Sequence, residues 1–91
     1  MAVNFHVDTD TGTNGELCLK LSGDFDGTSA LELADLLNIY AKSTHRIFLD
    51  TNGLKEVWAF GRAVFADACA GLQEVRSGAT ELVVTGEKLT L

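Results

Sequence analysis

Apolar and polar residues alternate along the first part of the chain, and this pattern predicts a β-hairpin. One alternating segment spans residues 3–8 and a second spans residues 16–22. The residues between them, 8–15, are mostly Thr, Asp and Gly and end in Asn14-Gly15, a dipeptide typical of hairpin turns. The two strands should pair antiparallel, and the residues expected on their interior faces are Val3, Phe5, Val7, Leu17, Leu19 and Leu21.

The remaining pattern predicts helices that alternate with buried strands. Residues 29–42 and 61–76 have apolar side chains at helical spacing, whereas 47–49 and 81–86 are short apolar runs typical of buried strands. The expected order is therefore β-β-α-β-α-β, and its last two β-α-β steps require parallel pairing through right-handed crossovers. We predict a single α/β domain over residues 1–91, with a small mixed sheet of about four strands and helices mainly on one face.

The segment from Arg46 to Phe65 is the predicted working surface. It reads as a strand, a polar turn and the start of a helix, and such junctions often bind ligands in open α/β sheets. Trp58 and Phe60 lie there beside Gly61 and Arg62, and exposed aromatic residues next to arginine are typical of binding hot spots. The alternative is that one of the two rings fills the core at the base of the helix.

Three aspartates are the candidates for chemistry. Asp24, Asp26 and Asp50 could gather at one end of the sheet, where paired carboxylates can perform acid–base catalysis. A structural role is the favoured explanation: turn formation and helix capping for Asp24 and Asp26, because Asp26, Thr28 or Ser29 can cap the first helix, and an exposed strand end for Asp50. The sequence has no nucleophile motif, phosphate-binding loop, dinucleotide motif or zinc spacing. We therefore predict no enzymatic activity, no cofactor and no metal site.

Charge narrows the class of partner. The net charge is −6, of which residues 1–45 carry −5. This half of the chain would repel nucleic acid and anionic membranes and would attract a basic protein, although the charge can also serve solubility alone. No apolar run is long enough to span a bilayer, and the first residues have no signal-peptide pattern, so a cytoplasmic protein is expected. The isolated Cys18 and Cys69 fit reduced thiols.

These residues resemble a known family, the STAS domains of sulfate transporters and anti-sigma factor antagonists. Gly23-Asp24-Phe25-Asp26, followed by Thr28-Ser29-Ala30 and a leucine-rich helix, is similar to the family's glycine-x-hydrophobic-aspartate opening. Residues 47–50, followed by Leu54, Val57, Gly61 and an alanine-rich helix, resemble its central strand, switch loop and second helix. Residues 82–86 resemble its next strand, and the resemblance covers about residues 3–88.

The resemblance implies a bacterial cytosolic protein that binds a regulatory protein, often a kinase-like anti-sigma factor. In switch-type members a Ser or Thr at the start of the second helix is phosphorylated, which prevents binding. Here the matching positions read Trp58-Ala59-Phe60-Gly61, and no Ser or Thr lies between Lys55 and Arg76. The family's further C-terminal helix or strand has no counterpart. A homodimer or a stable complex with a larger partner is therefore expected, since either would cover apolar surface.

Together these observations predict a protein-interaction module that resembles an anti-sigma factor antagonist and acts in signal transduction and transcription regulation without the phospho-switch. The alternative is a small-ligand or nucleotide sensor that holds an anion at Gly61-Arg62. The residues expected to contact the partner are Asp24, Asp26, Thr28, Ser29, Trp58, Phe60, Gly61 and Arg62.

Overall fold

In the described part of the chain, four strands and two helices follow one another in the order that the sequence predicts, and a third, short helix is additional. A computed structural model describes residues 4–12 and 15–89 of the chain. Its elements are β1 (His6–Thr11), β2 (Glu16–Phe25), α1 (Gly27–Tyr40), β3 (Arg46–Val57), α2 (Ala59–Ala70), α3 (Gln73–Arg76) and β4 (Glu81–Thr85).

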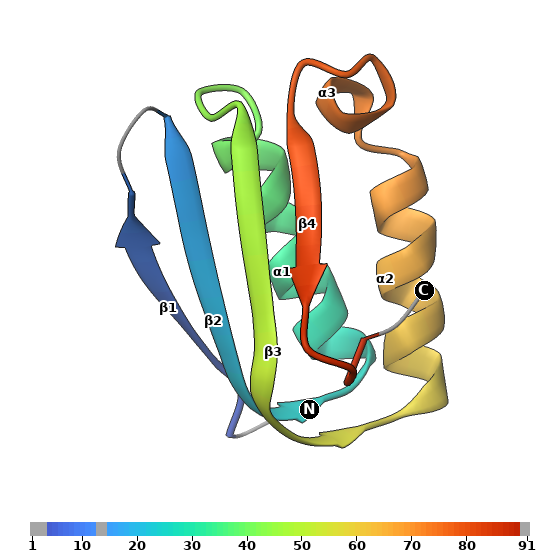
Figure 1. Ribbon diagram of the computed structural model, residues 1–91. Helices are drawn as coiled ribbons and strands as arrows, with labels where there is room; N and C mark the ends of the chain where they lie inside the picture. The colour runs from blue at the N-terminus through green and yellow to red at the C-terminus, as the bar shows by residue number, and fades with distance from the viewer. Residues whose placement is uncertain (1–3, 13–14, 90–91) are drawn as a thin grey trace.

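The described strands form one mixed sheet in the order β1-β2-β3-β4. β1 pairs antiparallel with β2, whereas β2–β3 and β3–β4 are parallel, as the two β-α-β steps require. Helices α1 and α2 lie on the same face of this sheet (Figure 1). The predicted α/β class and mixed four-stranded sheet are therefore confirmed.

The core lies between the sheet and these two helices. Leu17, Leu19 and Leu21 are buried, as the alternation predicts, and Leu33 and Leu37 of α1 pack on them. Three aromatic rings form a chain through the middle of the core: Phe25 contacts Phe5 edge-on at 5.7 Å between centroids and Phe65 at 6.0 Å. Leu89 is fully buried, so the segment after β4 is part of the core.

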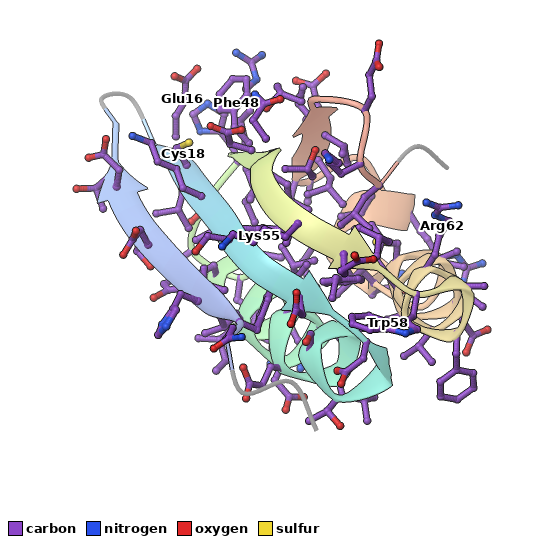
Figure 2. The ribbon with its side chains drawn as sticks, turned by 90° about the horizontal axis from the view of Figure 1, so that it is seen from below. Glu16, Cys18, Phe48, Lys55, Trp58 and Arg62 are labelled. Atoms are coloured by element: carbon purple, nitrogen blue, oxygen red, sulfur yellow. The ribbon has the colours of Figure 1, made fainter. Side chains whose placement is uncertain are left out.

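The opposite face of the sheet carries an ion-pair network. Arg46 donates to Glu16 at 2.9 Å and to Glu81 at 2.7 Å, and these bonds connect β2, β3 and β4. The two carboxylates and their hydrogen bonds raise the pKa of Arg46 further above its ordinary value. Cys18 and Phe48 are register partners on the same face, and Figure 2 shows them close to Glu16 at one end of the sheet.

Several predicted strand boundaries are wrong. β2 does not end at Ser22 but continues to Phe25. β3 does not stop at Asp50 but continues to Val57 through the predicted turn. Thr51 is buried and donates to the Thr85 carbonyl at 2.8 Å, and Gly53 allows close approach to the Leu21 carbonyl. β1 likewise extends to Thr11 because an edge strand needs only backbone pairing, so its polar side chains can remain exposed. Val3 and Asn14 lie outside the described residues.

The helix predicted over residues 61–76 is two helices. α2 ends at Ala70 with Gly71 as its C-cap, and α3 begins at Gln73. Glycine is a poor helix former, which explains the break at this point. The first helix also begins earlier than predicted, at Gly27, because Asp26 provides its cap.

Candidate functional site

The starts of α1 and α2 lie side by side at one end of the sheet. Gly61 permits this contact: a Cβ at this position would lie 2.7 Å from the backbone carbonyl of Asp26 and 2.8 Å from that of Phe25. The Trp58 amide donates to the Phe25 carbonyl at 3.0 Å and fixes the entry into α2. Two segments far apart in the sequence, the β2–α1 junction and the β3–α2 junction, therefore form one surface.

Asp26 shapes the β2–α1 junction as the N-cap of α1. Its carboxylate accepts hydrogen bonds from the Ser29 amide at 2.9 Å and from the Ser29 hydroxyl at 3.0 Å. These bonds favour the charged form, and the backbone amide is the largest cause of a lowered pKa of Asp26. Because the pKa is depressed in the folded state, the stabilising contribution is present above the unfolded-state pKa. It is lost as the pH falls through the lower, folded-state pKa.

Ser29 is part of the same cap rather than of the exposed surface. Its side chain is buried, and its hydroxyl also lies 3.0 Å from the Asp24 carbonyl oxygen. Thr28 next to it is exposed. Of the caps that the sequence leaves open, Asp26, Thr28 and Ser29, the structure selects Asp26, and Ser29 supplies the hydrogen-bond donors.

Trp58 and Phe60 are both exposed. The exposed fraction is 49% for Trp58 and 72% for Phe60, so neither ring fills the core. Trp58 takes the N-cap position of α2 without a side-chain hydrogen bond, and the aromatic ring of Phe60 lies over Gly27 of α1. Large apolar side chains exposed together at one place are characteristic of binding surfaces.

An apolar groove runs between the two helices at this point. Its volume is about 330 Å³. We call it the inter-helix groove, and its lining consists of Asp26, Gly27, Thr28, Leu31, Phe60 and Val64. A larger, more open hollow of about 440 Å³ lies elsewhere, with Lys42, His45 and Glu74 in its lining. Of these two hollows, we take the inter-helix groove as the candidate binding site, because its walls carry exposed apolar side chains.

Arg62 does not line the inter-helix groove with Phe60. Its guanidinium donates to the Lys88 carbonyl at 3.4 Å, and Figure 2 shows Trp58 and Arg62 on different sides of the start of α2. The space around Gly61 is filled by backbone carbonyls of the β2–α1 junction. Because carbonyl oxygens repel anions, this arrangement argues against an anion or nucleotide at Gly61-Arg62.

The three candidate aspartates do not form one cluster. Asp50 is the register partner of Lys20 in the middle of the sheet and accepts from the Asn52 amide at 3.0 Å. Asp24 lies further along β2, opposite Glu56. Among residues 4–12 and 15–89, no group of three or more His, Cys, Asp or Glu side chains is placed to hold a metal ion.

The thiol on α2 lies away from this surface. Burial raises the pKa of Cys69 to about 11, so its thiol stays protonated near neutral pH.

No helix in the described part of the chain is both long enough and apolar enough to cross a membrane.

Gly27, Leu31 and Val64 are the groove residues that were not predicted as site residues. Leu31 is 60% exposed and lies off the predicted apolar face of α1. A large apolar residue outside the apolar face of an amphipathic helix is a signal that could have identified it. Val64 is one of the apolar residues at helical spacing in residues 61–76, and it is half-buried at the groove wall.

Comparison with solved structures identifies the architecture. A STAS domain of an anti-sigma factor antagonist from Rhodobacter sphaeroides superposes with a TM-score of 0.70 at 14% identity, covering 98% of both chains. The unphosphorylated anti-sigma factor antagonist SpoIIAA gives 0.66 at 11% identity, covering 87% of this chain and 71% of its own. The chain has a STAS-like fold.

The other comparisons add nothing on function. A protein named Mglu gives a TM-score of 0.71 at 16% identity, but this STAS-like chain spans only 20% of that protein's length. Scans against protein-family models and against curated proteins gave no match. At these identities the likeness concerns the fold alone.

Proposed function

We propose that this STAS-like chain is a non-enzymatic protein-interaction module that binds a regulatory protein through the surface at the starts of α1 and α2. The observation that carries the proposal is the joint exposure of Trp58 and Phe60 beside the inter-helix groove. Aromatic residues at the centre of an interface commonly contribute most of its binding energy. The likeness to anti-sigma factor antagonist domains supports a protein as the partner.

The proposed binding does not depend on phosphorylation at the start of α2. This helix begins with Trp58 as its N-cap and has no hydroxyl residue over its length. A phosphate at a helix start acts by adding charge to a hydroxyl side chain, and no such side chain is present there. We infer an interaction that is constitutive or regulated elsewhere, in the bacterial cytosol that the resemblance implies.

The contact residues are proposed to be a subset of those expected from the sequence. Trp58, Phe60 and Thr28 are exposed and lie at or beside the groove, and Asp26 lines it. Asp24, Ser29 and Gly61 support this surface from beneath: the Asp24 carbonyl and Ser29 belong to the cap, and Gly61 packs against its backbone. Arg62 is proposed to contact only a partner large enough to reach the segment after β4.

Removing either aromatic ring should greatly weaken partner capture without unfolding the domain. Trp58→Ala and Phe60→Ala are each expected to reduce affinity about thirtyfold, since truncating a hot-spot residue costs about 2 kcal/mol or more. Both side chains are exposed, so the melting temperature should change little. The measurement is quantitative affinity capture from an extract of the native cell, with each bait checked by circular dichroism.

Ile39→Ala is the matched control. Ile39 is 62% exposed and lies in the last turn of α1, away from the groove. The Ile39→Ala variant should capture the same partner as the wild type does. Unchanged capture by folded Trp58→Ala and Phe60→Ala variants would show that this surface does not bind the partner.

A further inference from the structure

The two edges of the sheet differ in how they are protected from further strand pairing. β1 and β4 are the edge strands, and each pairs with one neighbour among the described strands. Along β1, Asp8 and Asp10 are exposed, and charged side chains at a sheet edge discourage pairing with another strand. β4 reads Glu-Leu-Val-Val-Thr, and its one charged residue, Glu81, is bound to Arg46. β4 is therefore the edge that is open to a further strand.

The backbone of β4 presents hydrogen-bonding groups at this edge. The Glu81 amide donates to the His45 carbonyl at 2.8 Å, which shows the side of β4 that faces β3. Backbone groups of successive residues alternate between the two sides of a strand, so those of Val83 also face β3, whereas those of Leu82 and Val84 face the free edge. No other described residue is bonded to these outward-facing groups. Such a row of N–H and C=O groups is a template for another strand.

A second copy of β4 satisfies these groups in one antiparallel register. When Val83 of each copy lies opposite Val83 of the other, Leu82 lies opposite Val84 of the second copy, and each such pair exchanges both of its backbone hydrogen bonds. In any other antiparallel register, Leu82 or Val84 has no outward-facing partner within β4 of the second copy. The strand is thus complementary to itself about a two-fold axis at Val83, as a symmetric dimer requires.

The side chains and charges also match in this register. On the face of the sheet opposite the helices, Cys18, Phe48 and Val83 are register partners in one apolar row, and contact between the two Val83 side chains joins the rows of both copies. Glu81 lies opposite Thr85 of the second copy, so no like charges are opposed within β4. The first 45 residues, which include β1 at the other edge of the sheet, carry −5 of the net charge of −6 (Figure 1). Most of the repulsion between copies therefore arises away from β4.

We propose that two copies of this chain form a symmetric dimer by antiparallel pairing of their β4 edges, centred on Val83, which joins the two sheets into one. The interface shares no residue with the inter-helix groove, so it goes beyond the proposed function and does not depend on it. A five-residue edge is a small interface, and we expect a dissociation constant of about 10–100 μM.

The test is analytical ultracentrifugation of the wild type and of two charged variants over a range of concentrations. Val83 is half-buried on the face opposite the helices, so Val83→Lys and Val83→Glu should both fold, which circular dichroism checks. Each should weaken the dimer about tenfold or more, because like charges are directly opposed at the two-fold axis. An equimolar mixture of the two variants should dimerise again, because the opposed charges then attract.

Ile39→Lys is the matched control, since it makes the same change of charge at another β-branched residue. Ile39 is 62% exposed on α1, and its variant should dimerise as the wild type does. Amide hydrogen exchange gives a second readout: exchange at Leu82 and Val84 should slow as the protein concentration rises, whereas exchange at Val83 should change little.

Three results would overturn the β4 dimer. They are a wild type that stays monomeric at millimolar concentration, a dimer that persists in both Val83 variants, and a dimer that Phe60→Ala disrupts while Val83→Lys does not. Folded Val83→Lys should still capture the regulatory partner, because that binding is proposed to use Trp58 and Phe60. Failure of the dimer and failure of the proposed function would therefore be seen in different variants.

Discussion

Replacing Phe25 by alanine is expected to remove about 3–5 kcal/mol from the free energy of unfolding, the usual cost of truncating a fully buried phenylalanine. Phe25 has no exposed surface and joins Phe5 and Phe65 at the centre of the core. A chain of 91 residues has a total stability of roughly 5–14 kcal/mol. The variant should therefore lose a large share of its stability, measurable as a lower urea midpoint in chemical unfolding.

Phe48→Ala provides the comparison for this experiment. Phe48 is the same residue type but is half-buried on the opposite face of the sheet, outside the core cluster. Its truncation should cost clearly less, about 1 kcal/mol. Equal losses for the two variants would mean that the core is not centred on Phe25.

A valine at Gly61 is expected to be the second most damaging change, and it should act on binding as well as on stability. The atoms that its Cβ would meet are backbone atoms of Phe25 and Asp26 at 2.7–2.8 Å, which cannot rotate away. The start of α2 would have to move from the start of α1, which widens the groove between them. We expect a loss of about 3 kcal/mol in urea unfolding, at the upper end of overpacking costs, together with loss of partner capture.

Gly71→Ala is the matched glycine substitution. Gly71 has helical backbone angles as the C-cap of α2, and a Cβ there would make an ordinary contact at 3.5 Å with the Ala68 carbonyl. The stability should stay the same or rise by about 0.4–1 kcal/mol. If Gly61→Val left the free energy of unfolding as little changed as Gly71→Ala does, this result would contradict the close contact between the starts of α1 and α2.

The sequence predicts the parts of this fold that depend on local periodicity. The alternation around Leu17, Leu19 and Leu21 places the core face of β2, and the helical spacing places α1. Local patterns did not predict the length of β3, because Thr51 is polar and is buried only through its bond to Thr85 on another strand. Nor did they predict that Gly71 ends α2, since a single glycine is tolerated inside many helices.

The candidate site was only partly predictable for a similar reason. Trp58 and Phe60 were identifiable because they stand at a strand–helix junction next to a glycine. The opposite wall of the groove was not, because Leu31 becomes part of it only when Gly61 brings α2 against the start of α1. The role of Ser29 depends on the local geometry of the β2–α1 junction, in which its buried hydroxyl donates to the Asp24 carbonyl.

The measurement that tests the central claim most directly is site-specific photocrosslinking in the native cell, with a photoreactive phenylalanine analogue at position 60 or at position 39. Both positions are exposed and lie on helices, so the two probes differ mainly in their distance from the inter-helix groove. If the surface at the helix starts binds a regulatory protein, position 60 should form a discrete crosslink to that protein and position 39 should not. Crosslinks of equal yield at both positions, or a crosslink at position 39 alone, would contradict the proposed binding surface.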